Sequence, residues 1–275
     1  MKRSVFIFLS LFLLAGCRED VPVIYNEQAV ISYDIEAPVE FEIKSTSSAG
    51  AVNTLWYGVY HKKADGSYVY MEDMSSFVTI TDPSSIQVPV SLIKDQEYRI
   101  VFVAQHRSSE ANSYTYTIDG EGIMKYNTSA ANAHSSAEEL DAFIFVDETG
   151  VMDGDLKKNI ELERPLSRIS LYTSSSSQPE KTTVKVSGVP ASYDLFADKA
   201  SEETMELTFG PFAPDESTVV SGGQTCDNVV SFYVFGGNEV KCDFTFTYAD
   251  NATKTLTVEK VSTAPNHKTN IVGNI

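Results

Sequence analysis

The sequence predicts an all-β protein whose strands pack as antiparallel β-sandwiches. Apolar side chains recur at every second position through most of the chain, which is the period of a strand with one buried face. The 14 tyrosines and 15 phenylalanines add aromatic residues that favour strands. Turn signals such as Asp65-Gly66 and Gly236-Gly237 separate the apolar stretches, while helical periodicity is scarce. Many short strands with frequent turns are typical of sandwiches.

The chain opens with the layout of a lipoprotein signal peptide over residues 1–16. Lys2 and Arg3 give a positive start, and residues 5–15 are apolar except for Ser10. This run suits a secretory signal and is shorter than the roughly 18 residues that a membrane-spanning helix needs. We therefore expect the segment to direct export and to be removed afterwards.

The end of the signal predicts a lipid-attachment site. Leu14-Ala15-Gly16-Cys17 resembles the lipobox of bacterial lipoproteins, in which the cysteine thiol receives a diacylglycerol. We expect cleavage between Gly16 and Cys17, further acylation with fatty acids such as palmitate, and a lipidated tether over residues 17–27. Arg18-Glu19-Asp20 resembles a charged tag that directs many Bacteroidales lipoproteins to the outer face of the outer membrane. A plain signal peptide with an incidental cysteine stays open as the alternative.

The composition argues against a nucleic-acid partner. The full chain has 21 basic and 38 acidic residues, and removal of residues 1–16 leaves 21 − 2 = 19 basic residues against 38 acidic ones, a net charge of −19. Such a surface repels phosphate backbones. The 42% hydrophobic content supports well-packed cores.

Three regions of the first half read as strands. Residues 39–43 alternate between apolar and charged side chains, and residues 54–70 form a hairpin in which Asp65-Gly66 indicates a type I′ turn. Residues 96–107 are apolar at both odd and even positions near their centre, so we expect this strand to be covered on both sides.

The second half has further strand patterns at residues 182–188, 204–209, 228–248 and 254–260. Within the long third stretch, we expect Gly236-Gly237-Asn238 to turn a hairpin. Helix signals in the whole chain are limited to two short segments.

The clearer helix candidate covers residues 136–143, with Ser136 as N-cap and Glu139 completing a capping box. Residues 190–200 allow a short helix or an irregular loop. Polar residues 147–159 are the best domain boundary, which gives an N-terminal β-sandwich at 28–155 and a C-terminal β-sandwich at 156–275.

Two cysteines remain once Cys17 is lipidated. In an exported protein Cys226 and Cys242 could form a disulfide. The predicted turn, however, would place Cys242 opposite about Ser231, so a bridge requires neighbouring strands other than this hairpin. Two buried free thiols are the alternative.

No pattern in the sequence indicates an enzyme, a cofactor or a metal site. The four histidines are scattered without metal-ligand spacing, and nucleotide-binding, zinc-protease and serine-hydrolase motifs are absent. Asp147, Glu148 and the pair Asp153 and Asp155 could hold a hard cation, but solvated turn acids are the simpler interpretation.

Aromatic residues crowd the predicted hairpin. Trp56, Tyr57 and Tyr60 could stack on sugar rings and so form a glycan-binding face. Period-two packing in a core explains the same residues without any ligand. The sequence leaves both interpretations open.

Five stretches occur in the order seen in fimbrillin-like lipoproteins of Bacteroidales. They are residues 55–69, 96–105, 139–145, 162–173 and 266–275, and the resemblance that they carry extends over nearly all of the mature chain. The sequence therefore resembles relatives of the major and minor fimbrial subunits of type V pili. This resemblance implies two transthyretin-like β-sandwich domains in tandem, a lipidated precursor at the cell surface, and no enzyme.

In pilins of this type, a protease releases the first strand and the C-terminal extension of a neighbour replaces it. This sequence departs from that pattern, because no arginine lies between Arg18 and Arg99, which leaves Lys44 as the possible processing site. The sequence also ends at Ile275, where pilins usually continue. We therefore expect a first strand within residues 28–44 to stay in its own sheet, and the C-terminal strand to pair within its own domain with Ile271 facing the core.

These inferences predict a cell-surface protein with a structural or adhesive role, as a pilus anchor, a terminal unit or a stand-alone lipoprotein of the outer membrane. Its partners would be the membrane, through the lipid, and other fimbrillin-like subunits or host and glycan ligands. The alternative is a glycan- or ligand-binding surface lipoprotein of a nutrient-uptake system.

Overall fold

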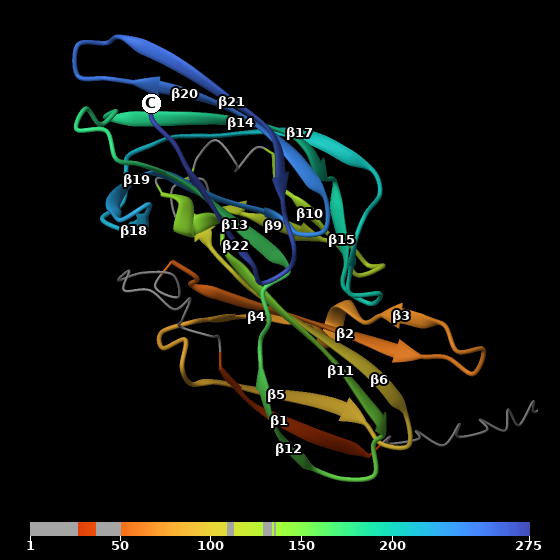
Figure 1. Ribbon diagram of the computed structural model, residues 1–275. Helices are drawn as coiled ribbons and strands as arrows, with labels where there is room; N and C mark the ends of the chain where they lie inside the picture. The colour runs from red at the N-terminus through yellow and green to blue at the C-terminus, as the bar shows by residue number, and fades with distance from the viewer. Residues whose placement is uncertain (1–26, 37–50, 109–112, 129–133, 135) are drawn as a thin grey trace, which may run out of the picture.

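The computed structural model describes residues 27–36, 51–108, 113–128, 134 and 136–275. These residues form 22 β-strands and two short 3-10 helices, with no α-helix in the described part (Figure 1). The all-β fold class predicted from the alternating pattern is confirmed.

Two facing sheets make up the lower half of the molecule in Figure 1. The first has the order β12-β1-β5, and the second has the order β11-β6-β2-β3, with β4 also paired to β2. Their strands are β1 (Gln28–Glu36), β2 (Thr54–Lys62), β3 (Tyr68–Tyr70), β4 (Ser76–Thr79), β5 (Ile86–Ile93), β6 (Glu97–Gln105), β11 (Ala142–Val151) and β12 (Leu156–Glu161).

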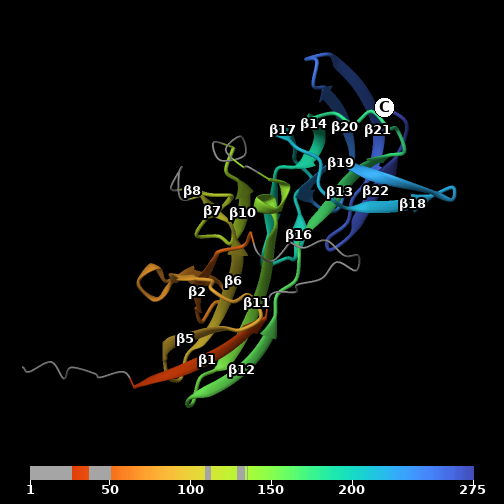
Figure 2. The same ribbon diagram turned by 90° about the vertical axis from the view of Figure 1, so that its left-hand side faces the viewer.

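Two four-stranded sheets make up the upper half, with the orders β18-β19-β13-β22 and β17-β14-β20-β21. Their strands are β13 (Leu166–Thr173), β14 (Lys181–Pro190), β17 (Thr204–Phe212), β18 (Thr218–Ser221), β19 (Gln224–Phe235), β20 (Glu239–Thr247), β21 (Thr253–Ser262) and β22 (Lys268–Val272). The β18–β19 hairpin extends away from the body in Figure 2.

A smaller sheet with the order β16-β15-β10-β9 combines strands from both halves of the sequence. The remaining elements are β7 (Arg107–Ser108), β8 (Ser113–Tyr114), β9 (Tyr116–Ile118), β10 (Ile123–Tyr126), β15 (Ser192–Asp194), β16 (Lys199–Ala200) and the 3-10 helices η1 (Glu72–Met74) and η2 (Ala137–Leu140). Residues 190–200, for which we expected a short helix or a loop, thus contribute to three strands.

The strand β6 contributes to both hydrophobic cores of the described chain. Ile100 and Phe102 belong to the core between the two lower sheets. Val101 and Val103 point to the opposite face and belong to the larger core that continues into the upper half. All four side chains are fully buried, so the predicted cover on both sides of this strand is confirmed.

The strand β12 lies beyond the boundary that we predicted between residues 155 and 156. It nevertheless pairs in parallel with β1, so the lower sheet extends to Glu161. Conversely, β10 pairs with β15 of the second half. The two halves of the sequence therefore exchange strands across the predicted boundary, and the division into two tandem domains stays a prediction.

The predicted hairpin at Gly236-Gly237-Asn238 is wrong. β19 pairs with β13 and β18, whereas β20 pairs with β14 and β21, so the connection crosses from one sheet to another. Adding a Cβ at Gly236 would cause a collision with the backbone of Ala264 and Pro265, so this crossing requires glycine. Two strands that pair within one sheet and two strands that face each other across a core show the same alternating pattern. The pattern therefore could not distinguish a hairpin from a crossing between sheets.

Two local predictions are right in place but wrong in detail. The hairpin of β2 and β3 forms, but its turn is wider than type I′. Gly66 has a φ of 85°, Asp65 does not have a positive φ, and Lys63 N–H donates to the Ser67 carbonyl oxygen over 2.8 Å. The helix near Ser136 is the 3-10 turn η2, and the Ser136 side chain makes no capping hydrogen bond.

Candidate functional site: the first strand and its surroundings

The strand β1 lies in the middle of its sheet, with a partner on each side. It pairs antiparallel with β5 and parallel with β12. Ala29, Ile31, Tyr33 and Ile35 alternate along it and are at most 1% exposed. Within the described residues β1 therefore lies inside a sheet of its own chain, and its retention there after any processing stays a prediction.

Tyr33 ties β1 to the facing sheet and to β12. Its ring packs edge-on against Phe102 with 4.8 Å between ring centroids, and its hydroxyl donates a 2.6 Å hydrogen bond to Asp147 Oδ2. The Lys158 ammonium contacts the same carboxylate at 2.7 Å. Burial, followed by the hydrogen bond and the charge of Asp147, raises the pKa of the Tyr33 hydroxyl, so the group stays neutral and donates.

Polar contacts also hold the outer side of the β1–β12 ladder. Asp155 Oδ1 accepts a 2.9 Å hydrogen bond from the Val30 N–H, directly before β12 begins. The Lys157 ammonium lies 2.6 Å from Asp34 Oδ2. The carboxylate of Asp155 therefore satisfies a backbone donor beside the start of the parallel ladder.

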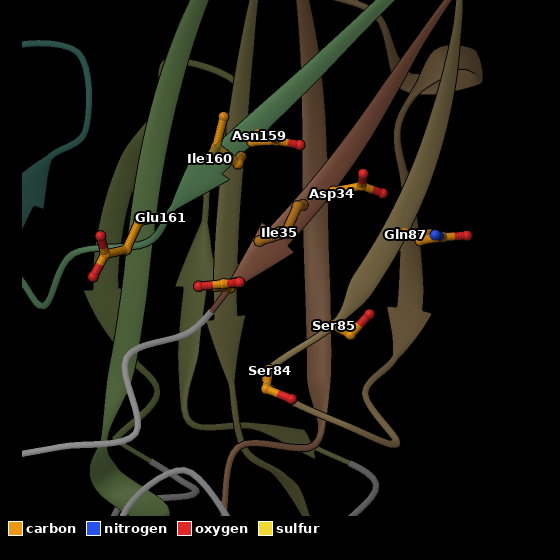
Figure 3. Close-up of a pocket in the computed structure, with 9 residues that line it drawn as sticks. Asp34, Ile35, Ser84, Ser85, Gln87, Asn159, Ile160 and Glu161 are labelled. Carbon is orange, nitrogen blue, oxygen red and sulfur yellow. The ribbon is translucent and has the colours of Figure 1, made fainter.

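A polar cavity of about 490 Å³ lies where β1 and β12 end (Figure 3). It is lined by Asp34, Ile35, Glu36, Ser84, Ser85, Gln87, Asn159, Ile160 and Glu161. Within the described chain, no group of three or more His, Cys, Asp or Glu side chains is placed to hold a metal ion. The arrangement can present polar groups to a passing chain, but it contains no nucleophile–base pair.

The C-terminal strand β22 pairs in parallel with β13 of the upper half. Ile271 is half-buried and packs against the larger core. The prediction that this segment pairs within its own half, with Ile271 toward the core, is therefore confirmed.

The three aromatic residues that we singled out do not form a common open face. Tyr60 is fully buried, and its ring lies edge-on to Phe196 with 4.9 Å between centroids. Trp56 is 6% exposed, and its indole lies over Gly58, where any Cβ would collide with the ring. Tyr57 points to the other face of β2, half-buried near Phe102. The predicted stacking platform of Trp56, Tyr57 and Tyr60 is wrong, because a neighbouring sheet covers two of the three rings.

The disulfide prediction is also wrong. Cys226 lies on β19 and Cys242 on β20, in different sheets, and both are buried free thiols. Burial raises the pKa of the Cys242 thiol to about 12, so it is unreactive at neutral pH. The alternative of two free thiols is confirmed.

Cys17 and Gly16 of the predicted lipid-attachment site and the possible processing residue Lys44 lie outside the described residues. Within the described ranges, no helix has the length and apolar character to cross a membrane.

The sequence analysis overlooked the residues that fix β1. Tyr33 looked like one more buried residue in a strand with alternating apolar side chains. Lys158 lies in the polar stretch 147–159, which we interpreted as a domain boundary. A polar-tipped aromatic on the buried face of a strand was the available signal, because a buried tyrosine hydroxyl usually requires a partner.

Comparison with solved structures finds similar folds in proteins from Bacteroides and Porphyromonas. A structure from Bacteroides thetaiotaomicron, described as a candidate adhesin, is 13% identical over 83% of this chain and 79% of its own, with a TM-score of 0.52. Candidate polysaccharide-binding proteins from the same species are 10% identical over 90% of this chain and 92% of theirs, with a TM-score of 0.51. The fimbrial anchor protein Mfa2 from Porphyromonas gingivalis is 14% identical over 84% and 82%, with a TM-score of 0.44.

The all-β fold of several antiparallel sheets, which the resemblance to fimbrillin-like proteins implies, is confirmed. In sequence, the chain belongs to the family described as "family of unknown function (DUF6562)", which matches residues 24–275. No curated protein matches the chain.

Proposed function

We propose that this protein is a non-enzymatic surface lipoprotein that is anchored through Cys17 in the outer membrane and has a structural or adhesive role. The main support is the position of β1, which is hydrogen-bonded on both sides within its own sheet. A subunit that keeps its first strand has no vacant groove for a neighbour's strand. It therefore suits a pilus anchor, a terminal unit or a stand-alone surface protein.

The similar structures add support from their descriptions, which name an adhesin and polysaccharide-binding proteins rather than enzymes. Lipid anchoring is supported by the sequence 14–17 and by the place of β1, which begins at Gln28 soon after the predicted tether. The partners would be the membrane and other fimbrillin-like subunits or surface ligands.

Anchoring is tested by comparing the wild-type protein with Cys17→Ala in membrane fractions, together with labelling by a fatty-acid probe. We expect the wild-type protein to be labelled and membrane-bound, and the variant to be unlabelled and either soluble or retained as a precursor. An unlabelled, soluble wild-type protein would refute the lipoprotein assignment.

Retention of β1 is tested by treating the purified protein with trypsin, which can cut at Lys44, and in parallel with an arginine-specific protease. We expect a monomer on native gels, because the ladders to β5 and β12 hold the strand after any cut beyond Glu36. Ladders that resist SDS after either treatment would instead identify a polymerising subunit.

A second candidate function is ligand binding in a nutrient-uptake system. It is favoured by a cavity on another part of the surface, where an aromatic ring is exposed.

A further inference from the structure

A cavity of about 190 Å³ opens beside β4, away from the surroundings of β1. It is lined by Trp56, Phe77, Gln105, Tyr114, Tyr116, Thr117 and Ile118, and we call it the aromatic groove. The four aromatic residues come from four strands, β2, β4, β8 and β9. Trp56 and Phe77 lie opposite each other in the β2–β4 pair, and Tyr114 and Tyr116 come from a later stretch of the chain.

One ring of the groove is open to solvent. Phe77 is 49% exposed and stacks on Tyr114 with 4.8 Å between centroids and 13° between planes. Within the described chain it is the one aromatic residue among the exposed large hydrophobic side chains. By contrast, Trp56 and Tyr116 are buried and form the base of the groove. The groove therefore has a rigid aromatic base and an accessible flat ring at its rim.

A buried amide at the groove has an unused donor. Gln105 is 1% exposed, and its Oε1 accepts a 2.7 Å hydrogen bond from the Tyr116 N–H, which fixes the orientation of the amide. Gln105 Nε2 has no hydrogen-bond partner among the described residues. The Nε2 atom is not completely enclosed by protein. Because Gln105 lines the groove, this donor is available to a molecule bound there.

We propose that the aromatic groove binds one neutral pyranose ring of a glycan. The flat C–H face of a pyranose stacks on an aromatic ring such as Phe77, and a sugar hydroxyl oxygen accepts from Gln105 Nε2. The hydroxyl groups of Tyr114 and Thr117 lie at the same groove and can bind further sugar hydroxyls. The small volume suits a single ring, since pockets for drug-sized ligands measure roughly 300–1,000 Å³.

Other occupants fit less well. An apolar side chain from a protein partner would cover the groove and leave the buried Gln105 donor without an acceptor, which is unfavourable. An acidic sugar would approach a chain of net charge −17. The inference deepens the adhesive part of the proposed function by naming a ligand class, but it does not depend on lipid anchoring.

The chain contains its own reporter for this site. Trp56 is the single tryptophan of the sequence, and it lines the groove. We would titrate the purified full chain, in a detergent that carries no sugar, with methyl glycosides of glucose, galactose, mannose and N-acetylglucosamine and with their neutral oligosaccharides. We expect a saturable change in Trp56 fluorescence with at least one of them. No change with any of these probes, or a stronger response to phenylalanine-containing peptides, would overturn the proposal.

Variants at the rim separate binding from folding. Phe77→Ala should weaken the binding of the responding sugar at least tenfold, whereas Phe77→Tyr should keep it within threefold because the flat ring remains. Val220→Ala, at another exposed apolar side chain, is the matched control and should bind like the wild type. Equal thermal unfolding midpoints would show that Phe77→Ala is folded, and unchanged affinity in that folded variant would overturn the proposal.

The donor is tested with Gln105→Glu, which keeps an oxygen for the Tyr116 N–H and removes the amide donor. We expect at least tenfold weaker binding, and an unchanged affinity would contradict the role of Gln105. Membrane fractionation of Cys17→Ala addresses anchoring separately, so failure of the sugar titration and failure of the anchoring experiment remain distinguishable.

Discussion

The first and last strands of the described chain, β1 and β22, are held in very different ways. Each is paired in parallel with one neighbour, β12 or β13. β1 has a second, antiparallel partner in β5 and a fully buried face, whereas β22 is an edge strand without a fully buried residue. A central strand is fixed by two ladders and a core, while an edge strand relies on one ladder and partial burial.

The largest effect is expected at the centre of β1. Ile31→Ala removes a fully buried side chain from the lower core and should lower the free energy of unfolding by about 2–5 kcal/mol. Ser32→Ala, on the exposed face of the same strand, is the control and should change it by less than about 0.5 kcal/mol. Denaturant unfolding gives both values, provided that the dependence of the unfolding free energy on denaturant concentration is unchanged. Equal losses for Ile31→Ala and Ser32→Ala would contradict the burial of the Ile31 side chain.

A smaller loss is expected from Tyr33→Phe, which removes the hydroxyl that donates to Asp147. Hydrogen bonds to charged groups contribute about 1.5–3 kcal/mol, and the Lys158 contact to Asp147 remains. Tyr248→Phe is a matched control, because the buried Tyr248 hydroxyl has no partner among the described residues. A loss as large as that of Tyr33→Phe in the control would show that the hydrogen bond to Asp147 does not set the effect.

The smallest effect is expected at the edge strand. Ile271→Ala removes a half-buried side chain from β22 and should lower the free energy of unfolding by about 1 kcal/mol. Val272→Ala, which is more exposed, should have no measurable effect. Amide hydrogen exchange should likewise be faster in β22 than in β1. Slower exchange in β22 would reverse the comparison.

Alternating hydrophobicity was sufficient to predict the all-β class, and the continuous apolar run was sufficient to predict the two-sided burial of β6, because both depend on which side chains avoid water. It could not predict which strands pair. The segments on either side of Gly236-Gly237 look like one hairpin, yet they belong to facing sheets. The polar residues of β12 look like a linker because Lys157 and Lys158 satisfy carboxylates on β1 and β11 rather than pack in a core.

The candidate sites were harder to predict for the same reason. Tyr60 looked like a ligand-binding residue because the sequence does not show the sheet that covers it, and Trp56 lies at the base of the aromatic groove and not on an open face. Phe77 and Gln105 drew no notice, since the groove joins them to side chains of β2, β8 and β9, and the sequence does not show that these strands meet. A site built by several strands appears only when their order is known.

The two ladders of β1 have a mechanical consequence. Eight register pairs join β1 to β5 and six join it to β12. In a protein tethered through Cys17, tension from a bound surface would reach the fold at Gln28 and act along the strand axis. Such a load shears both ladders together and does not open them one bond at a time. Rupture would then require many hydrogen bonds to fail in a single event, which suits the proposed anchoring role.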